Sequence, residues 1–273
     1  EFQNNFSINA GLTKWKQNPA GIIRYQIIPE IGDPTTIHQL NTTEASIGFR
    51  WAPKEQFYQG KLYRTPIYNK YPIFTFNYTA GIKGFLGGEY NYHNLTAGAF
   101  KRVYLSQFGY ADVNLDGTYV LGVKIPYPLL TLHRANQTYA YQLQSYNLMN
   151  FMEFISDHHA SINVQYYMNG FILNKLPLIK KLQLREVFSF KGLYGGLRDQ
   201  NNPTYNRDLF AWQRNIDNEI SSFTFGDKPY MEASVGLGNI FKVLRVDYVK
   251  RLNYLNQPNV SDWGIRARIK VDF

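Results

Sequence analysis

The C-terminal segment of the chain alternates between apolar and polar positions without interruption. Its apolar positions are Trp263, Ile265, Ala267, Ile269, Val271 and Phe273. The positions between them are Asp262, Gly264, Arg266, Arg268, Lys270 and Asp272. Because successive side chains of a strand point to opposite faces, this segment predicts a strand with one apolar and one charged face. A strand between lipid and the polar interior of a barrel has this pattern.

The same alternation recurs along the chain and predicts about twelve strands. The most regular segments, apart from the last, are 6–13, 44–51, 74–83, 159–169 and 244–254. Less regular segments are 20–28, 90–103, 107–123, 145–155, 181–193 and 230–238. Each is close to, or a little longer than, the roughly 9 to 11 residues that a tilted membrane strand requires. We therefore expect an all-β fold, an antiparallel transmembrane β-barrel with about twelve strands visible and roughly 12 to 16 in the complete barrel.

The strand order predicts which connections lie on which side of the membrane. With the C-terminus on the periplasmic side, the turn 238–241 is a short periplasmic turn, as is usual in such barrels. The segments 53–71 and 194–229 then become long extracellular loops. Three connections on the periplasmic side, 29–41, 124–144 and 172–180, are expected to be long.

Composition supports this fold and excludes several others. The 273 residues contain 16% aromatic residues, no Cys, and no apolar run long enough for a transmembrane helix. The formal net charge is +9, but the basic residues are spread over many segments, so we expect no nucleic-acid partner. A polar lumen, anionic lipid head groups or unspecific charge patterning would each explain the charge. We expect residues 1–273 to form one outer-membrane β-barrel domain, the C-terminal part of a longer protein.

The charged positions of the last two predicted strands form the first candidate site. On the predicted lumen face lie Arg245, Asp247, Arg251, Arg266, Arg268 and Lys270. Opposite charges on neighbouring strands stabilise strand pairing, which favours a solvated, internally salt-bridged wall. A plug contact or anion selectivity in a pore is the alternative.

The apolar positions of the last strand form the second candidate site. They resemble the C-terminal aromatic signal of bacterial outer-membrane barrels, which the assembly machinery reads. The signal residues are Trp263, Ile265, Ile269, Val271 and Phe273.

No residue pattern predicts catalysis, a cofactor or a metal site. The cluster Asp157-His158-His159 follows Ser156, but adjacent His residues on a strand point to opposite faces and cannot chelate one metal without a bend. His93 and His133 have no ligand spacing and are expected in loops or at an interface. We therefore expect that the chain is not an enzyme.

Three stretches carry a family resemblance: Ser145–His159, Asn169–Val187 and Gly236–Leu252. The specific parts are Glu-Phe-Ile-Ser-Asp, at 153–157, and Leu-Pro-Leu-Ile-Lys-Lys, at 176–181. Over roughly residues 90–273, the sequence resembles the C-terminal barrel, a domain of unknown function, of Bacteroidota outer-membrane carboxypeptidase-like regulatory domain-containing proteins. This barrel is a distant relative of BamA-like insertase and secretion barrels. The resemblance implies an N-terminal regulatory-type β-domain in the full-length protein, and it does not imply peptidase activity.

These patterns predict a non-catalytic protein of the bacterial outer membrane with a role in outer-membrane biogenesis, assembly or transport. A passive or gated channel or porter, and a barrel scaffold that binds partners through long extracellular loops, are the alternatives. The apolar face of the last strand argues against a soluble lipocalin-like binder. The expected partners are outer-membrane lipid and lipopolysaccharide, the barrel-assembly machinery, and other outer-membrane proteins in a complex.

Overall fold

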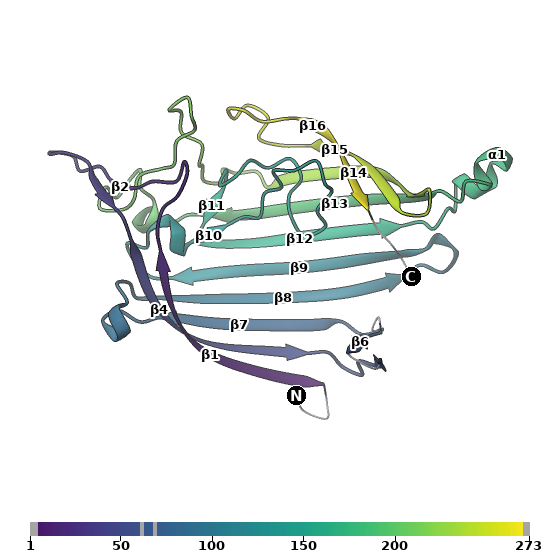
Figure 1. The fold of residues 1–273 in the computed structure, drawn as a ribbon, viewed down its shortest axis with the longest axis horizontal. Coiled ribbons are helices and arrows are strands. Elements are labelled where there is room, and N and C mark those ends of the chain that lie inside the picture. Colours follow the sequence, from purple (N-terminus) through teal and green to yellow (C-terminus); the bar gives the residue numbers. More distant parts are fainter. Residues whose placement is uncertain (1–4, 61–62, 68–69, 270–273) are drawn as a thin grey trace.

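Ten long strands form one antiparallel sheet in the computed structural model, which describes residues 5–60, 63–67 and 70–269. In spatial order they are β1 (Phe6–Gln17), β4 (Leu40–Trp51), β7 (Ile73–Gly81), β8 (Tyr92–Tyr104), β9 (Tyr110–Leu121), β12 (His158–Tyr167), β13 (Arg185–Gly196), β14 (Tyr230–Ile240), β15 (Leu244–Arg251) and β16 (Trp263–Ile269). Each long strand pairs with the long strands that precede and follow it in the sequence (Figure 1). The strands β1 and β16 are the two edges, and within the described residues they do not pair with each other. The predicted all-β antiparallel fold is confirmed.

The remaining elements are short and lie in the connections. Three small antiparallel pairs join β2 (Tyr25–Ile27) to β3 (Thr35–Ile37), β5 (Phe57–Gln59) to β6 (Arg64–Pro66), and β10 (Thr131–Leu132) to β11 (Ile155–Ser156). The helices are α1 (Pro177–Lys180) and the 3-10 turns η1 (Phe85–Gly87), η2 (Ser106–Phe108), η3 (Tyr127–Leu129), η4 (Leu173–Lys175) and η5 (Asp199–Asn201). None of the helices in the described ranges is long and apolar enough to cross a membrane.

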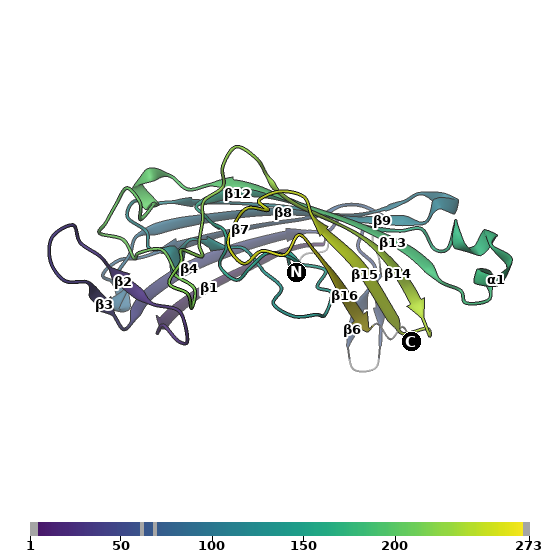
Figure 2. The same cartoon turned by 90° about the horizontal axis from the view of Figure 1, so that it is seen from above.

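The two faces of the sheet have opposite chemistry. The sheet is curved, and the chain between β9 and β12 lies on its concave side (Figure 2). On the convex face, apolar side chains such as Val235, Tyr248 and Ile265 are exposed by 57%, 47% and 57%. On the concave face, Lys191 and Glu232 are only 2% exposed. The predicted alternation therefore exists, with apolar residues outward and polar residues inward.

Ten of the twelve predicted strands are the ten strands of this sheet. The other two, 20–28 and 145–155, are not strands of it. Residues 25–27 form β2 in a small hairpin, and only Ile155 of the second segment lies in a strand, β11. Their apolar side chains pack into buried clusters, which include Tyr25 and Met149, instead of alternating between two faces.

The predicted sidedness of the connections is partly wrong. The chain regions 18–39, 82–91, 122–157, 197–229 and 252–262 meet at one end of the sheet, which we call the loop end. The described parts of 52–72 (52–60, 63–67 and 70–72) and the regions 105–109, 168–184 and 241–243 meet at the opposite end, the turn end. The two predicted extracellular loops, 53–71 and 194–229, therefore begin at opposite ends of the sheet. An odd number of long strands separates them, namely β7, β8, β9, β12 and β13, and two connections lie at the same end only when that number is even. Residues 29–41 and 124–144 likewise begin at the loop end and not beside the 241–243 turn.

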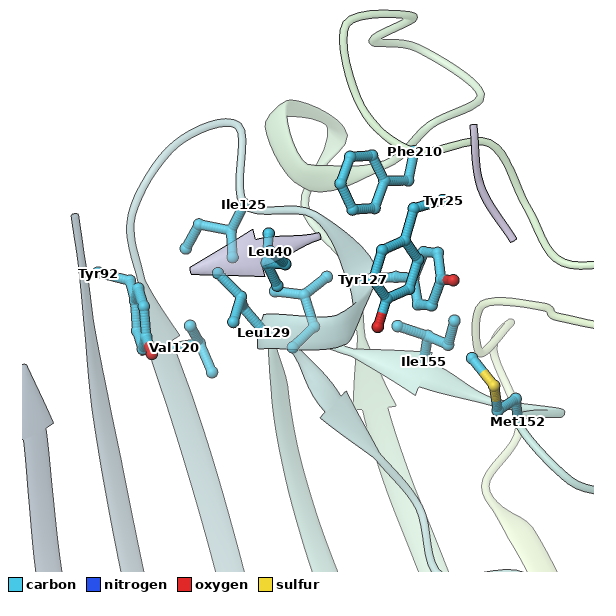
Figure 3. Packing of buried hydrophobic residues seen from close by; sticks show 11 residues of the cluster. Tyr25, Leu40, Tyr92, Val120, Ile125, Tyr127, Leu129, Met152, Ile155 and Phe210 are labelled. Carbon is cyan, nitrogen blue, oxygen red and sulfur yellow. The ribbon is translucent and has the colours of Figure 1, made fainter. Parts of the chain in front are cut away.

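An apolar cluster lies where the strands end at the loop end of the sheet (Figure 3). Tyr25 of β2 stacks on Phe210 with ring centroids 5.1 Å apart, and Tyr127 of η3 packs edge-on against both rings. Leu40 and Val120 from the ends of β4 and β9 are fully buried in the same cluster. The cluster holds the chain between β9 and β12 against the sheet.

Candidate functional site

One segment of the chain covers the polar face of the sheet. Residues 122–157, which we call the inner segment, leave β9 at the loop end, lie on the concave side and return to β12 (Figures 1 and 2). The five predicted lumen-facing charges that the structure describes, Arg245, Asp247, Arg251, Arg266 and Arg268, lie on the same side as this segment. We therefore treat the contact between the inner segment and the sheet as the candidate functional site.

Arg245 and Asp247 form an ion pair within β15. Arg245 Nε and Nη2 donate to the two carboxylate oxygens of Asp247, each at 2.7 Å. The guanidinium lies 4.4 Å from the ring centroid of Tyr141 of the inner segment. The hydroxyl of Tyr141 donates to Ser189 Oγ on β13 at 2.8 Å. These two charged residues therefore pair with each other and pack against the inner segment.

Arg251 anchors the inner segment at the loop end of β15. Its Nη2 and Nη1 donate to Glu153 Oε1 at 2.5 Å and Glu153 Oε2 at 3.0 Å. Further donor contacts go to the carbonyl oxygens of Leu148 and Tyr254, at 3.3 and 2.8 Å. Because a buried charge is tolerated only when it is paired and hydrogen-bonded, this arrangement fixes the inner segment to the sheet.

A second buried pair, on β13 and β14, was not among the predicted site residues. The carboxylate of Glu232 accepts the backbone N–H of Asn147, at 2.8 and 2.9 Å, and that of Leu148 at 3.2 Å. Lys191 Nζ lies 3.6 Å from Glu232 and donates to the carbonyl oxygens of Gln142 and Ser145 at 2.8 and 2.5 Å. Both residues occupy inward positions of alternating segments, which is the sequence signal that would have found them.

The arginines of β16 have fewer hydrogen-bond and ion-pair partners among the described residues than those of β15. Arg266 Nη2 donates to the carbonyl oxygen of Asn147 at 3.0 Å, while its Nε is buried and has no hydrogen-bond partner among the described residues. Arg268 faces the same side, opposite Arg245, and makes no ion pair within the described part of the chain. Lys270, the sixth predicted lumen residue, lies outside the described residues.

The structure brings together four side chains that the sequence did not connect. His133 Nε2 lies 2.9 Å from Ser156 Oγ, and its ring packs edge-on against His159 at 4.8 Å. His159 Nε2 lies 3.7 Å from Asp116 Oδ2. Burial is the main reason that the pKa of His133 is lowered to about 3, and the charge of His159 lowers it further. This imidazole is therefore neutral. The prediction of isolated His residues missed this cluster, because His133 and Ser156 are distant in sequence and share no motif.

Only part of this cluster faces a cavity. Ser156 is fully buried. No group of three or more His, Cys, Asp and Glu side chains that could hold a metal ion is present in the residues the structure describes. Asp116, His133 and His159 line a cavity of about 330 Å³ together with Asn114, Arg134 and Asn163. His93 instead lies at the loop end of β8, where its Nδ1 is 2.7 Å from Tyr78 Oη.

Asp157 and His158 form a separate cluster at the loop end. His158 Nδ1 lies 2.7 Å from Asp157 Oδ1, and Arg198 Nε donates to Asp157 Oδ2 at 2.7 Å. Burial alone would raise the pKa of Asp157, but hydrogen bonds from Arg198, Asn201 and His158 hold it below its usual range. As predicted, His158 and His159 point to opposite faces of β12. Their side chains are 42% and 7% exposed.

The predicted C-terminal signal residues that the structure describes lie on the convex face. Trp263, Ile265 and Ile269 are exposed by 52%, 57% and 74%. The ring of Trp263 stacks on Tyr248 of β15 at 5.9 Å. Val271 and Phe273 lie outside the described residues.

Comparison with known proteins gives a fold and a family. The structure is similar to that of BamA from Haemophilus ducreyi lacking POTRA domains 1-3, with a TM-score of 0.54 and 10% sequence identity. The similarity covers 97% of this chain and 52% of the BamA chain, so this chain spans about half the length of that structure. It shows the fold alone. No curated protein matches the sequence. Residues 26–203, more than half of the chain, match the model described as the C-terminal domain of a family of unknown function (DUF5686), and the chain therefore belongs to this family.

Proposed function

We propose that this chain is a membrane-embedded domain of the bacterial outer membrane and acts, without catalysis, in outer-membrane biogenesis. The observation that carries the proposal is the distribution of side chains over the two faces of the sheet. Apolar side chains are exposed on the convex face, and ion pairs are buried on the concave face. A water-soluble sheet would cover its apolar face, whereas a sheet that faces lipid leaves it bare. The BamA-like fold supports a biogenesis role.

The inner segment on the concave side favours a role in biogenesis over passive conduction of ions or solutes. The inner segment is held there by the Arg251–Glu153 pair and by the hydrogen bonds of Glu232 to its backbone. Because removing one member of a buried ion pair is strongly unfavourable, this segment does not leave the concave side freely. In planar lipid bilayers we expect no stable, salt-dependent current, and such a current would favour the channel alternative.

The proposed partners follow from the two faces. Outer-membrane lipid and lipopolysaccharide would contact the convex face, and the barrel-assembly machinery would read the C-terminal strand during insertion. Other outer-membrane proteins would be the substrates or neighbours of the domain. The resemblance to Bacteroidota carboxypeptidase-like regulatory domain-containing proteins supports a longer protein with an N-terminal β-domain.

Depletion of the protein in its own cells tests the proposal. Fractionation should recover the protein with the outer membrane, and a folded barrel should migrate differently before and after boiling. On depletion, we expect folded outer-membrane proteins or surface lipopolysaccharide to decrease, while inner-membrane proteins stay constant. A protein found in the aqueous periplasmic fraction, or a depletion that leaves the outer membrane unchanged, would overturn it.

A further inference from the structure

The connection between β12 and β13 projects beyond the turn end of the sheet. Its helix α1 lies past the ends of both strands in two perpendicular views (Figures 1 and 2). Residues 169–185, which we call the rim segment, contain the motif Leu-Pro-Leu-Ile-Lys-Lys, at 176–181, that carries part of the family resemblance. The contact between the inner segment and the sheet involves none of these residues, so the motif must have another role.

The rim segment exposes its aliphatic side chains instead of packing them. Leu178 and Leu182 are 83% and 62% exposed, and Ile172 and Leu176 are 49% and 48% exposed. A single exposed Leu is ordinary on a protein surface, but several in one short connection mark a surface that meets a membrane or another protein.

The exposed charges of the rim segment all have one sign. Its charged residues are Lys175, Lys180, Lys181 and Arg185, and all four are exposed. The acid that follows them, Glu186, is buried. None of the four cations makes an ion pair within the part of the chain that the structure describes. Cations beside exposed aliphatic residues are typical of segments that lie on a membrane containing anionic lipid.

Ring contacts place the start of the rim segment at the border of the convex face. Phe171 packs against Phe108 of the β8–β9 turn, with ring centroids 4.7 Å apart. The hydroxyl of Tyr166 on β12 donates to the carbonyl oxygen of Phe108 at 2.9 Å. The ring of Tyr166 stacks on Phe188 of β13, which faces the convex residue Val235 across the β13–β14 pair. The rim segment therefore continues the apolar convex face at a position where aromatic residues gather, as they do at a membrane–water interface.

Hydrogen bonds fix both ends of the rim segment to the sheet. Glu186 Oε1 accepts the backbone N–H groups of Ile172 and Leu173 at 3.0 and 2.5 Å. At the other end, Asn239 Nδ2 of β14 donates to the carbonyl oxygen of Gln183 at 2.8 Å. The exposed leucines and lysines lie between these two attachments and are therefore presented at a fixed place on the rim.

We propose that the rim segment lies in the lipid–water interface at the turn end and binds anionic phospholipid. Leu178 and Leu182 enter the acyl-chain region, and Lys180 and Lys181 bind lipid phosphates. Continuity with the convex face favours lipid over a partner protein as the occupant of this surface. With the end of β16 on the periplasmic side, as predicted, the turn end borders the leaflet opposite the surface lipopolysaccharide, so the anionic lipid is a phospholipid. This inference deepens the proposed membrane-embedded function by naming a lipid and its site, and it rests on that function for the lipid-facing convex face.

The experiment measures which lipid touches the rim segment in the reconstituted full chain. The sequence contains no Cys, so Leu178→Cys introduces a single thiol that carries a fluorescent label. The vesicles contain phosphatidylcholine and phosphatidylglycerol, and one of the two lipids at a time carries bromine on its acyl chains. Bromine quenches a fluorophore only at close contact. The ratio of quenching by the two lipids therefore gives their relative binding at position 178.

Two further label positions separate this inference from the proposed function. A label at Val235→Cys, on the convex face, should be quenched by either brominated lipid, because it tests only whether the sheet lies in the membrane. A label at Ile216→Cys, which is 90% exposed in the 197–229 connection, should not be quenched.

Matched lysine variants test the source of the lipid preference. The labelled Leu178→Cys protein receives either Lys180→Gln with Lys181→Gln in the rim segment, or Lys83→Gln with Lys228→Gln at the loop end. All four lysines are exposed, so neither pair of substitutions disturbs buried packing.

We expect phosphatidylglycerol to be preferred over phosphatidylcholine at position 178 by about fivefold or more, because each Lys near an anionic surface favours it. The Lys180 and Lys181 substitutions, or high salt, should reduce the preference to about twofold or less, and the control pair should leave it unchanged.

Three results would contradict these expectations in different ways. A label at position 178 that is not quenched, in protein whose label at position 235 is quenched, would overturn the inference and leave the proposed function standing. Equal quenching by the two lipids, or a preference that survives the loss of both lysines, would overturn anionic phospholipid as the ligand. A label at position 235 that is not quenched would overturn the proposed function together with the inference.

Discussion

The guanidinium of Arg251 and the carboxylate of Glu153 form a bidentate ion pair, and both side chains are buried. The N–O distances are 2.5 and 3.0 Å, and the side chains are 0% and 1% exposed. The pair joins β15 to the inner segment, across 98 positions of sequence. Because the partners lie on different elements, the pair reports on whether the inner segment is docked.

Removing one partner should be more harmful than replacing both. We expect Glu153→Ala to lower the free energy of unfolding by about 3 to 5 kcal/mol, since Arg251 would keep a buried, uncompensated charge. The double variant Glu153→Leu with Arg251→Met should lose less than the sum of the single variants. Denaturant titration of the protein in detergent or lipid measures both effects. Asp262→Asn, which breaks the exposed Lys250–Asp262 pair, is the control with little expected change.

The convex face should reject charge at the centre of a strand. Val235 on β14 is 57% exposed and lies between Phe188 and Tyr248. We expect Val235→Arg to weaken insertion into lipid vesicles by about 2 to 4 kcal/mol, the cost of a cation on a lipid-facing position. The measurement is the fraction of protein that becomes heat-modifiable after mixing with vesicles. Ile216→Arg, in the 197–229 connection where Ile216 is 90% exposed, should insert normally. Equal insertion of both variants would mean that the convex face does not contact lipid.

The sheet could be predicted from the sequence because period-two alternation records which face each residue occupies. The strand β16 and its neighbour β15 were predicted this way, and Arg245, Asp247 and Arg251 lie on the expected face. The pattern failed for segments 20–28 and 145–155. There, apolar residues pack in clusters formed with loops, and a cluster has no sequence period.

The site could be predicted only in part, because its contacts join elements of different kinds. Glu153 lies in segment 145–155, which the sequence predicts as a strand of the sheet, so nothing in its neighbourhood indicates that Arg251 is its partner. Lys191 and Glu232 occupy inward positions of alternating segments, but most of their hydrogen-bond partners are backbone groups of the inner segment. Backbone partners carry no residue-type signal. The position of the inner segment on the concave face therefore became visible only in the folded chain.

The neutral His133 should make stability depend on pH. Its pKa is about 3 in the folded chain and about 6.5 for an unperturbed His, because burial and the charge of His159 disfavour the imidazolium. Between these values the unfolded chain binds a proton that the folded chain does not. This contribution to stability is complete above about pH 6.5 and is lost as the pH falls towards 3, by at most about 1.4 kcal/mol per pH unit.

The contribution of His133 is measured by comparing how steeply the unfolding free energy changes with pH in the parent protein and in a His133 variant. We expect His133→Gln to flatten the decrease in unfolding free energy between about pH 6.5 and pH 4, in denaturant titrations at a series of pH values. His38→Gln, at an exposed position of the β2–β3 hairpin region, should keep the slope of the parent protein. A parent protein and a His133 variant with parallel pH profiles would show that His133 is not held neutral.

Gly236 on β14 should be required for the Arg245–Asp247 ion pair. A methyl group added at Gly236 would lie 2.7 Å from Asp247 Cγ, closer than van der Waals contact allows. Asp247 is fully buried and bound by Arg245, so its carboxylate cannot move aside without weakening that pair. Gly236→Ala should therefore cost about 1 to 3 kcal/mol of unfolding free energy. Gly238→Ala, two residues further along the same face, is the matched control, because its nearest atoms would be 3.6 and 3.7 Å away. If both substitutions shift the denaturation midpoint equally, the effect comes from the strand backbone and the proposed crowding of Asp247 is wrong.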